Sequence, residues 1–364
     1  MNNITSFPLP FHANNSSPSP NTHERDGLTL WFAVMLSISS IGILCNALLI
    51  TVIARSQKLR SGTGFLILNL SFTCIAMCTL NYPVHVILVY GHHFWFTPHP
   101  NACTLAHYFT VMTTYANNWS EACLGVNRFV ATILPHQYRT FTMWQACLSM
   151  GIFTWLIGAL SLIPFCTREV GYFTTSSQGQ CGLLATTKLG TWLVSFNSYA
   201  PYVVVGTAVL SILSKMARRK VRSVGVEPVV TCEKRSRTTD NARQQKLMYR
   251  RQINIAGMLL LCFIFNIATT LPMSLLNTFY YELYNRIPLL RLWMRIFVLI
   301  QYSFTPMIFF GCNKDYRQGL RNLTGHRAAR NNGAPTNTQG LDRMSLHKDA
   351  FVSTSASKKL KGSF

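Results

Sequence analysis

The chain has 364 residues, of which 49% are hydrophobic and only 12% are charged. A soluble domain usually carries about twice that charged fraction, and here the apolar residues form long blocks instead of short amphipathic stripes. The formal net charge of +22 suggests a nucleic-acid partner at first, but the placement of the basic residues argues against one.

Seven apolar blocks are long enough to cross a membrane, for which a helix needs roughly 20 residues. We place the spans at residues 28–54, 63–90, 103–133, 146–166, 190–214, 251–280 and 290–311. The polar segment 1–27 precedes them and carries N-glycosylation triplets at Asn3, Asn14 and Asn15. Such triplets are common by chance, so they count only if the segment lies outside the cell.

The Lys and Arg residues concentrate in alternate connections between the spans. The connection 215–251 and the tail after residue 312 are rich in them, whereas the connection 90–102 has none. The positive-inside rule therefore places the N-terminus outside and the C-terminus in the cytosol. We expect a multi-pass plasma-membrane protein whose basic segments face the anionic inner leaflet, with no nucleic-acid partner.

A short amphipathic helix is predicted at 312–323, with Tyr316, Leu320 and Leu323 on one side, so that it lies on the membrane surface. We expect residues 324–364 to form a disordered cytoplasmic tail. Serines and threonines in this tail can accept phosphate and recruit arrestin.

Two of the eleven cysteines stand out, because Cys103 begins the third span on the outer side and Cys181 lies in the outer connection 167–190. Both face an oxidising compartment, where a disulfide can form and persist. Such a bond would hold the connection over the mouth of the bundle. The alternative is two free thiols.

The separation of Cys103 and Arg128 is the most informative feature. Twenty-five residues at about 1.5 Å each take a helix from one membrane face to the other. This helix resembles the third helix of rhodopsin-like (class A) G-protein-coupled receptors, which has an outer cysteine and an inner Asp/Glu-Arg-Tyr triplet. Further landmarks of that family have counterparts in order along the chain: Gly42 with Asn46, Asn69-Leu70-Ser71, Trp95, Trp155, Pro164, Pro201, Leu271-Pro272, Thr305-Pro306, Phe309 and Tyr316.

The resemblance implies an all-α membrane protein, a seven-transmembrane bundle (28–311) followed by a short amphipathic eighth helix. It also implies a cell-surface receptor without cofactor or metal, which binds an extracellular ligand in the outer half of the bundle. Coupling to a heterotrimeric G protein would then involve Asn127, Arg128 and Phe129.

Several landmarks depart from the family pattern, which makes this a divergent member. The positions concerned are the second-helix acid (Cys74), the acid before the arginine (Asn127), the sixth-helix tryptophan (Thr270), the fifth-helix tyrosine (Val209) and the seventh-helix asparagine and tyrosine (Thr305 and Phe309). A cysteine is a poor ligand for a hard cation, so sodium regulation should be lost. A receptor-like decoy or scaffold that does not activate a G protein is therefore an alternative.

The activation switch is expected, by resemblance, at Asn118, Pro201, Asn266, Thr270, Pro272, Thr305, Pro306 and Phe309. Asn117 and Glu121 also lie deep in the third span, where polar groups must face the bundle interior. We expect Glu121 to be protonated, because burial disfavours the charged carboxylate. Either these groups form a polar latch, or they are interhelical hydrogen bonds of the ordinary kind.

The ligand pocket is expected among His85, His107, Thr110, Tyr115, Asn197, Asn277, Arg291 and Arg295, with Tyr280 nearby. By resemblance, Thr110 replaces the aspartate of amine receptors and Leu299 replaces the lysine of opsins, which argues against an amine and against a Schiff base. Two arginines four residues apart share one helix face and suit a carboxylate or phosphate. The predicted ligand is an anionic lipid, a metabolite or a peptide; alternatively, both arginines reach toward outer headgroups.

Two other classes compete with a receptor. The sequence shows no nucleophile–base pair, metal-ligand spacing or glycine-rich phosphate loop, so we do not expect an enzyme. It also shows no internal repeat, which argues against a channel or transporter.

Overall fold

The computed structural model describes residues 22–60, 62–94, 100–134, 136–175, 179–224, 257–276, 280 and 287–323. Predictions that fall on the rest, including the glycosylation sites Asn3, Asn14 and Asn15, Trp95 and the pocket residue Asn277, lie outside the described residues. The chain divides into two compact units, Met1–Gly319 and Leu320–Phe364. The transmembrane bundle belongs to the first of them.

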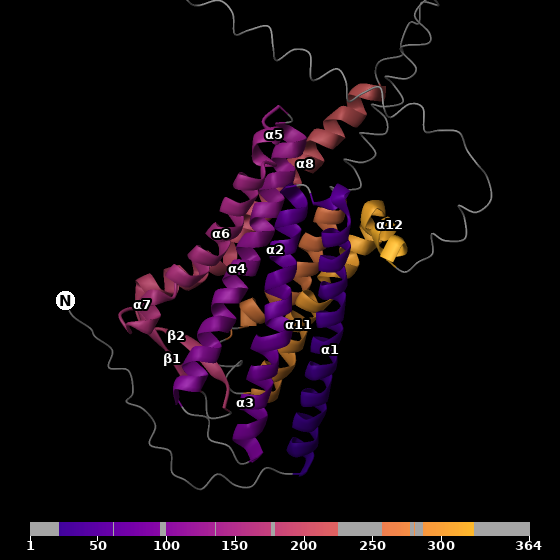
Figure 1. The fold of residues 1–364 in the computed structure, drawn as a ribbon. Coiled ribbons are helices and arrows are strands. Elements are labelled where there is room, and N and C mark those ends of the chain that lie inside the picture. Colours follow the sequence, from indigo (N-terminus) through magenta and orange to yellow (C-terminus); the bar gives the residue numbers. More distant parts are fainter. Residues whose placement is uncertain are drawn as a thin grey trace, which may run out of the picture. The chain divides into compact units, whose positions relative to one another are not determined.

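Long helices dominate the first unit (Figure 1). They are α1 (Thr22–Arg55), α2 (Gly62–Ala76), α3 (Tyr82–Phe94), α4 (Pro100–Ile133), α6 (Trp144–Leu160), α8 (Lys188–Val224), the helix Gly257–Leu276, and α11 (Pro288–Cys312). The short helices are η1 (Gln57–Leu59), α5 (Tyr138–Phe141), α7 (Ile163–Cys166) and α12 (Lys314–Leu323).

Six helical segments are long and apolar enough to cross a membrane: Asp26–Arg55, Gly62–His92, Trp144–Cys166, Lys188–Arg218, Gly257–Leu276 and Leu290–Cys312. The remaining predicted span is α4, which has 34 residues but carries many threonines and asparagines that lower its hydropathy. It packs against α2, α6 and α8, so its polar side chains are sheltered by neighbouring helices. The seven-helix fold predicted from the sequence is therefore confirmed.

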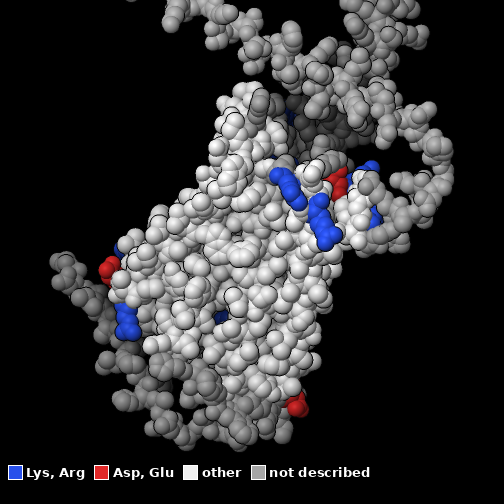
Figure 2. Space-filling model, in the orientation of Figure 1, with Lys and Arg blue, Asp and Glu red and all other residues white. Residues whose placement is uncertain are grey.

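Large apolar side chains cover the outside of the bundle. Leu44 is 71% exposed and Val203 is 63% exposed, which suits contact with lipid chains. On the face shown in Figure 2, the charged side chains gather toward the two ends, and the broad band between them is almost free of charge.

The second span is interrupted by a π-helical turn, Met77–Asn81, which joins α2 to α3. Pro83 lies two residues after this turn, as the second residue of α3. A proline cannot donate a backbone hydrogen bond and crowds the carbonyl four residues before it, and a wider turn relieves this conflict. The sequence analysis predicted a single continuous helix here and did not foresee the turn.

The resemblance landmarks of the first helix lie where α1 approaches α11 and the π turn. A Cβ added to Gly42 would lie 2.5 Å from Ser303 Oγ and 2.6 Å from Cys78 Sγ, so only glycine fits. Asn46 Nδ2 donates to the carbonyl of Gly42 at 2.9 Å and to that of Tyr302 at 3.0 Å. These contacts hold α1 against α11.

An antiparallel hairpin of β1 (Gly171–Thr175) and β2 (Cys181–Ala185) follows α7, with Gly171 opposite Ala185 and Thr175 opposite Cys181. It is the exception to the expected all-helical fold. We call this end of the bundle the hairpin end; α5 lies at the opposite end, the α5 end (Figure 1).

Candidate functional site

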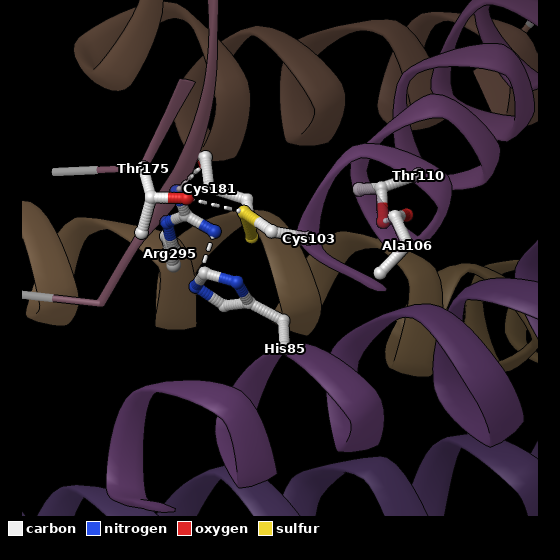
Figure 3. The surroundings of a disulfide bond; sticks show 7 residues. All are labelled: His85, Cys103, Ala106, Thr110, Thr175, Cys181 and Arg295. Atoms are coloured by element: carbon white, nitrogen blue, oxygen red, sulfur yellow. Dashed lines mark hydrogen bonds between the residues drawn. A yellow bond between two sulfur atoms is a disulfide. The ribbon is translucent and has the colours of Figure 1, made fainter. Parts of the chain in front are cut away.

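A disulfide joins Cys103 at the start of α4 to Cys181 at the start of β2, with the two Cα atoms 5.7 Å apart. Thr175 Oγ1, from β1, donates to Cys103 Sγ at 3.0 Å (Figure 3). Leu88 of α3 packs against the buried disulfide. The bond therefore fixes the hairpin to the start of α4, beside Leu88 of α3.

Arg295 of α11 lies beside this disulfide and is only 8% exposed (Figure 3). Its guanidinium donates to Nε2 of His85 on α3, and its Nη2 lies 3.5 Å from the carbonyl oxygen of Cys181. One side chain thus connects α11, α3 and the hairpin. Arginine is suited to this because its five donors spread in a rigid planar fork.

Arg291 and His107 complete the group at the hairpin end. A Cβ added to Gly182 in β2 would lie 3.4 Å from Arg291 Nη2, which places that guanidinium against the hairpin. The His107 ring packs edge-on against Phe173 of β1, with centroids 6.0 Å apart. The charges of both arginines lie close enough to act on the two imidazoles. We call His85, His107, Arg291 and Arg295 the outer basic cluster.

The other residues predicted for the pocket have contacts of their own. Tyr115 is buried in an apolar cluster with Phe165 and Val170, against which Phe173 of β1 also packs. Asn197 accepts from Trp119 Nε1 at 3.0 Å and donates to Ser161 Oγ at 3.0 Å, which directs it toward α6. Thr110 Oγ1 donates to the carbonyl of Ala106 in its own helix, at 2.8 Å (Figure 3).

Deeper in the bundle, Glu121 of α4 is the centre of a hydrogen-bonded group. Its Oε1 accepts from Gln301 Nε2 of α11 at 3.2 Å and from Asn117 Nδ2 of its own helix at 3.4 Å. Its Oε2 accepts from Asn266 Nδ2 of the helix Gly257–Leu276. Three amide donors from three helices therefore converge on one carboxyl group.

The amide oxygens of this group meet hydroxyl donors. Thr270 Oγ1 lies 2.8 Å from Asn266 Oδ1 and 2.7 Å from Gln301 Oε1. Tyr202 of α8 donates to Asn266 Oδ1 at 3.2 Å. We call Asn117, Glu121, Asn266, Thr270, Gln301 and Tyr202 the central polar network.

The network reaches the second span as well. Thr73 Oγ1 donates to Asn117 Oδ1 at 2.9 Å, and Cys74 Sγ lies 3.5 Å from the same oxygen. Cys74 occupies the position expected for the family's second-helix acid. The carboxylate in this region therefore comes from α4 instead of α2.

The remaining predicted switch residues differ from one another in burial and in contacts. Asn118 and Pro201 are buried on α4 and α8, and Pro306 is buried on α11, whereas Pro272 is exposed. Thr305 Oγ1 donates to the carbonyl of Gln301 at 2.6 Å. Phe309 is buried, and its ring centroid lies 6.1 Å from that of Tyr316 on α12.

At the α5 end, Asn127 connects three segments. It accepts from Thr63 Oγ1 of α2 at 3.1 Å and donates to the carbonyl of Phe141 in α5 at 3.3 Å. An amide can do both, whereas the family's carboxylate can only accept when ionised. Arg128 and Phe129 follow it and are both half-buried.

Tyr316 of α12 lies close enough to Arg128 for that charge to act on it. Burial raises the pKa of Tyr316 to about 12, while the nearby positive charge of Arg128 acts in the opposite direction. Lys215 of α8 lies at the same end and donates to the carbonyls of Thr132 at 2.6 Å and Ile133 at 3.2 Å. This cation satisfies the last carbonyls of α4, where the helix dipole favours positive charge.

A sequence model of the seven-transmembrane receptors of the rhodopsin family matches residues 45–309. The chain belongs to this family. Among solved structures, squid rhodopsin has the same fold, with a TM-score of 0.66 and 14% sequence identity over 85% of this chain and 91% of that chain.

Curated relatives match the receptor over part of their length. Human olfactory receptor 1A2 is 26% identical over 204 residues, which is 53% of this chain and 63% of that receptor. The bovine substance-K receptor is 24% identical over 139 residues, or 38% of this chain and 35% of the relative. The human neuromedin-K receptor is 23% identical over 139 residues, covering 38% and 29%. The receptor thus spans less than two thirds of these relatives.

The sequence named all of one group in the receptor and most of the other. For the outer basic cluster it named all four members, but not the hairpin that packs on them. For the central polar network it named Asn117, Glu121, Asn266 and Thr270 but missed Gln301 and Tyr202. Gln301 could have been found in the same way as the others, since it is also a polar residue deep in an apolar span, and such residues face the bundle interior.

Proposed function

We propose that the receptor lies in the plasma membrane with its hairpin end outside and its α5 end in the cytosol. There it binds an extracellular ligand and activates a heterotrimeric G protein. The observation that carries this proposal is the family match, which spans residues 45–309 and includes Arg128 at the inner end of α4. The basic connection 215–251 supports the orientation, because positive residues favour the cytosolic side.

The ligand is anionic in this proposal, carrying a carboxylate or a phosphate on a lipid, a metabolite or a peptide terminus. The support is the outer basic cluster, which gathers two guanidiniums and two imidazoles beside the disulfide (Figure 3). Arginine binds planar anions through two parallel hydrogen bonds. The low exposure of Arg295, 8%, argues against its reaching out to lipid headgroups. The names of two relatives, substance-K and neuromedin-K receptor, make peptides a sensible first class to screen.

The ligand class is tested with pairs of compounds that differ only in charge, such as fatty acids against their amides and peptides with a free against an amidated terminus. We expect responses to the acids alone, and a loss of at least tenfold in potency for Arg295→Ala, since hydrogen bonds to charged groups contribute about 1.5–3 kcal/mol each. Arg168→Gly is the matched control, because Arg168 is an exposed arginine at the same end whose φ of 64° suits glycine. Equal responses to acids and amides would refute the anionic class.

G-protein activation is tested by nucleotide exchange on a panel of G proteins, comparing the receptor with Arg128→Ala at matched surface level. We expect ligand-independent exchange that disappears in the variant. Arg317→Ala, which removes an exposed arginine from α12 near the same end, should keep it. No exchange from the receptor, with or without the compounds above, would favour a decoy or scaffold. Arrestin recruitment by the phosphorylated tail is a further part of the proposal and needs its own binding assay.

A further inference from the structure

Arg295 donates a hydrogen bond to a histidine, and this contact determines the charge of that histidine. A guanidinium has five N–H donors and no acceptor, and it keeps its proton in proteins. Its Nη1 group contacts Nε2 of His85, so the imidazole must accept through a lone pair on that nitrogen (Figure 3). A protonated imidazole donates at both nitrogens and has no lone pair to offer. His85 is therefore neutral in the structure, with its one ring proton on Nδ1.

The surroundings of His85 disfavour a second proton on its ring. His85 is buried in α3, with 6% of its surface exposed. Among the described residues, the titratable groups whose charges act on it are Arg295 and Arg291 of α11 and His107 of α4. The hairpin contributes Cys181, which lies in the disulfide and does not titrate. A further proton on His85 would place a cation against Arg295 and remove the acceptor of its Nη1 group.

A bound anion would reverse this balance. A carboxylate binds a guanidinium through two parallel N–H···O bonds. On the two Nη groups of Arg295 it would take the places that His85 and the carbonyl of Cys181 hold now. The released Nε2 of His85 would then face an anionic oxygen, and two acceptors cannot bond to each other. A proton on Nε2 removes this conflict, because the imidazolium donates to the anion and an opposite charge within about 4–6 Å favours the charged form.

We infer that the outer basic cluster binds its anion together with one proton, and that His85 accepts this proton at Nε2. Receptor with neutral His85, one carboxylate and one proton from the water outside combine into a complex in which a guanidinium and an imidazolium hold the anion from two sides. This inference rests on the proposed function, since it concerns the same site and requires an anionic ligand. It adds His85 as a ligand-binding residue and describes the ligand as an acid that binds best from an acidic medium.

His107 is the competing acceptor for the proton, because the charges of both arginines act on it as well. Its ring packs edge-on against Phe173 of β1, whereas the ring of His85 contacts Arg295 directly. An anion on Arg295 therefore displaces the present partner of His85 and leaves the aromatic contact of His107 in place. This difference assigns the proton to His85.

The test measures how the affinity for two small anions depends on pH, with the purified receptor in lipid nanodiscs. The probes are acetate and methanesulfonate at constant ionic strength between about pH 6 and 8, where a carboxylate is ionised. Binding is followed by saturation transfer from the receptor to the methyl NMR signal of the probe, with Arg295→Ala as the blank. Uptake of one proton per anion makes the affinity fall by up to about tenfold for each pH unit of increase, since the proton on His85 is lost as the pH rises. We expect this fall for both probes; methanesulfonate takes up no proton itself, so its pH dependence must come from the receptor.

His85→Gln is the decisive variant, because its amide can still donate to an anion but takes up no proton. We expect its affinity for both probes to be independent of pH. His136→Gln is the matched control, since His136 is an exposed histidine at the α5 end, and it should keep the pH dependence of the unmodified receptor. A dependence that survives in His85→Gln and disappears in His107→Gln would place the proton on the other imidazole and overturn the inference.

A second readout uses nitrogen NMR of the receptor made with isotope-labelled histidine. We expect the ring of His85 to be neutral without a probe and to become an imidazolium when acetate is bound. If His85→Gln fails to fold, the appearance of this one charged ring in the unmodified receptor decides. Binding of both probes without any pH dependence would refute the proton uptake and leave the anionic class of ligand intact. No binding above that of Arg295→Ala at any pH would refute the anionic class as well.

Discussion

Gly158 offers a sharp test of how closely α6 approaches α4. A Cβ added at this position would lie 2.8 Å from the backbone oxygen of Met112 and 3.5 Å from both Ala116 N and Tyr115 Cβ. Carbon atoms rarely come that near an oxygen, and a backbone group cannot rotate away as a side chain can. Small residues at such positions let membrane helices pack closely through their backbones.

The predicted cost of Gly158→Ala follows from two opposing effects. Alanine is favoured over glycine in a helix by about 1 kcal/mol. Forcing a methyl group into a filled interface costs about 1–3 kcal/mol. The first effect can be removed by comparison with Gly311→Ala in α11, where the added Cβ meets nothing within 4 Å. We therefore expect Gly158→Ala to be less stable than Gly311→Ala by about 1–3 kcal/mol.

The assay is thermal unfolding of the two purified variants and the unmodified receptor in the same detergent. Gly311→Ala should unfold at or slightly above the temperature of the unmodified receptor, and Gly158→Ala several degrees below Gly311→Ala. Equal unfolding temperatures for the two variants would refute the close approach of α6 and α4. If Gly311→Ala alone unfolded at a lower temperature than the unmodified receptor, Gly311→Ala would not be a valid reference for the helix preference of alanine.

Two further predictions concern the ends of the bundle. Cys103→Ser and Cys181→Ser should each lower stability by about 2–4 kcal/mol, and the double variant should lower it no further, as measured by thermal unfolding and surface level. Tyr316→Ala should cost about 3 kcal/mol because it removes a buried ring beside Phe309, whereas Tyr316→Phe should cost less than about 1 kcal/mol. Equal losses for the two Tyr316 variants would mean that the hydroxyl group, and not the ring, accounts for the stability.

The spans were predictable because hydropathy and length depend on composition alone. Even the exception is instructive: α4 was predicted as a span from its flanking landmarks, Cys103 and Arg128, although its own polar content places it below the hydropathy of the other six. Its sheltered place among α2, α6 and α8 explains how it tolerates these residues. Neighbouring helices satisfy what lipid cannot.

The direction in which a side chain points was harder to predict. Tyr115 and Asn197 were predicted to line the ligand pocket from their depth in the membrane; in the structure Tyr115 contacts a cluster that includes Phe165 of α7, and Asn197 donates to Ser161 at the end of α6. Depth along a helix follows from counting residues, whereas facing depends on the rotation of each helix against its neighbours. The hairpin was missed for a similar reason, because pairing Thr175 with Cys181 depends on a register that composition does not determine.

The π turn at Met77–Asn81 affects the directions in which the side chains of α3, the helix that follows it, point. Such a turn accommodates one residue more than an α-helical turn, and one residue corresponds to a rotation of about 100° around the helix axis. His85 lies beyond this turn, and in the structure its ring meets Arg295. A receptor of the same family that lacked one residue between Cys74 and His85 would direct a different side chain at that arginine. In comparisons between family members, the part of this span after the turn must therefore be aligned separately from the part before it.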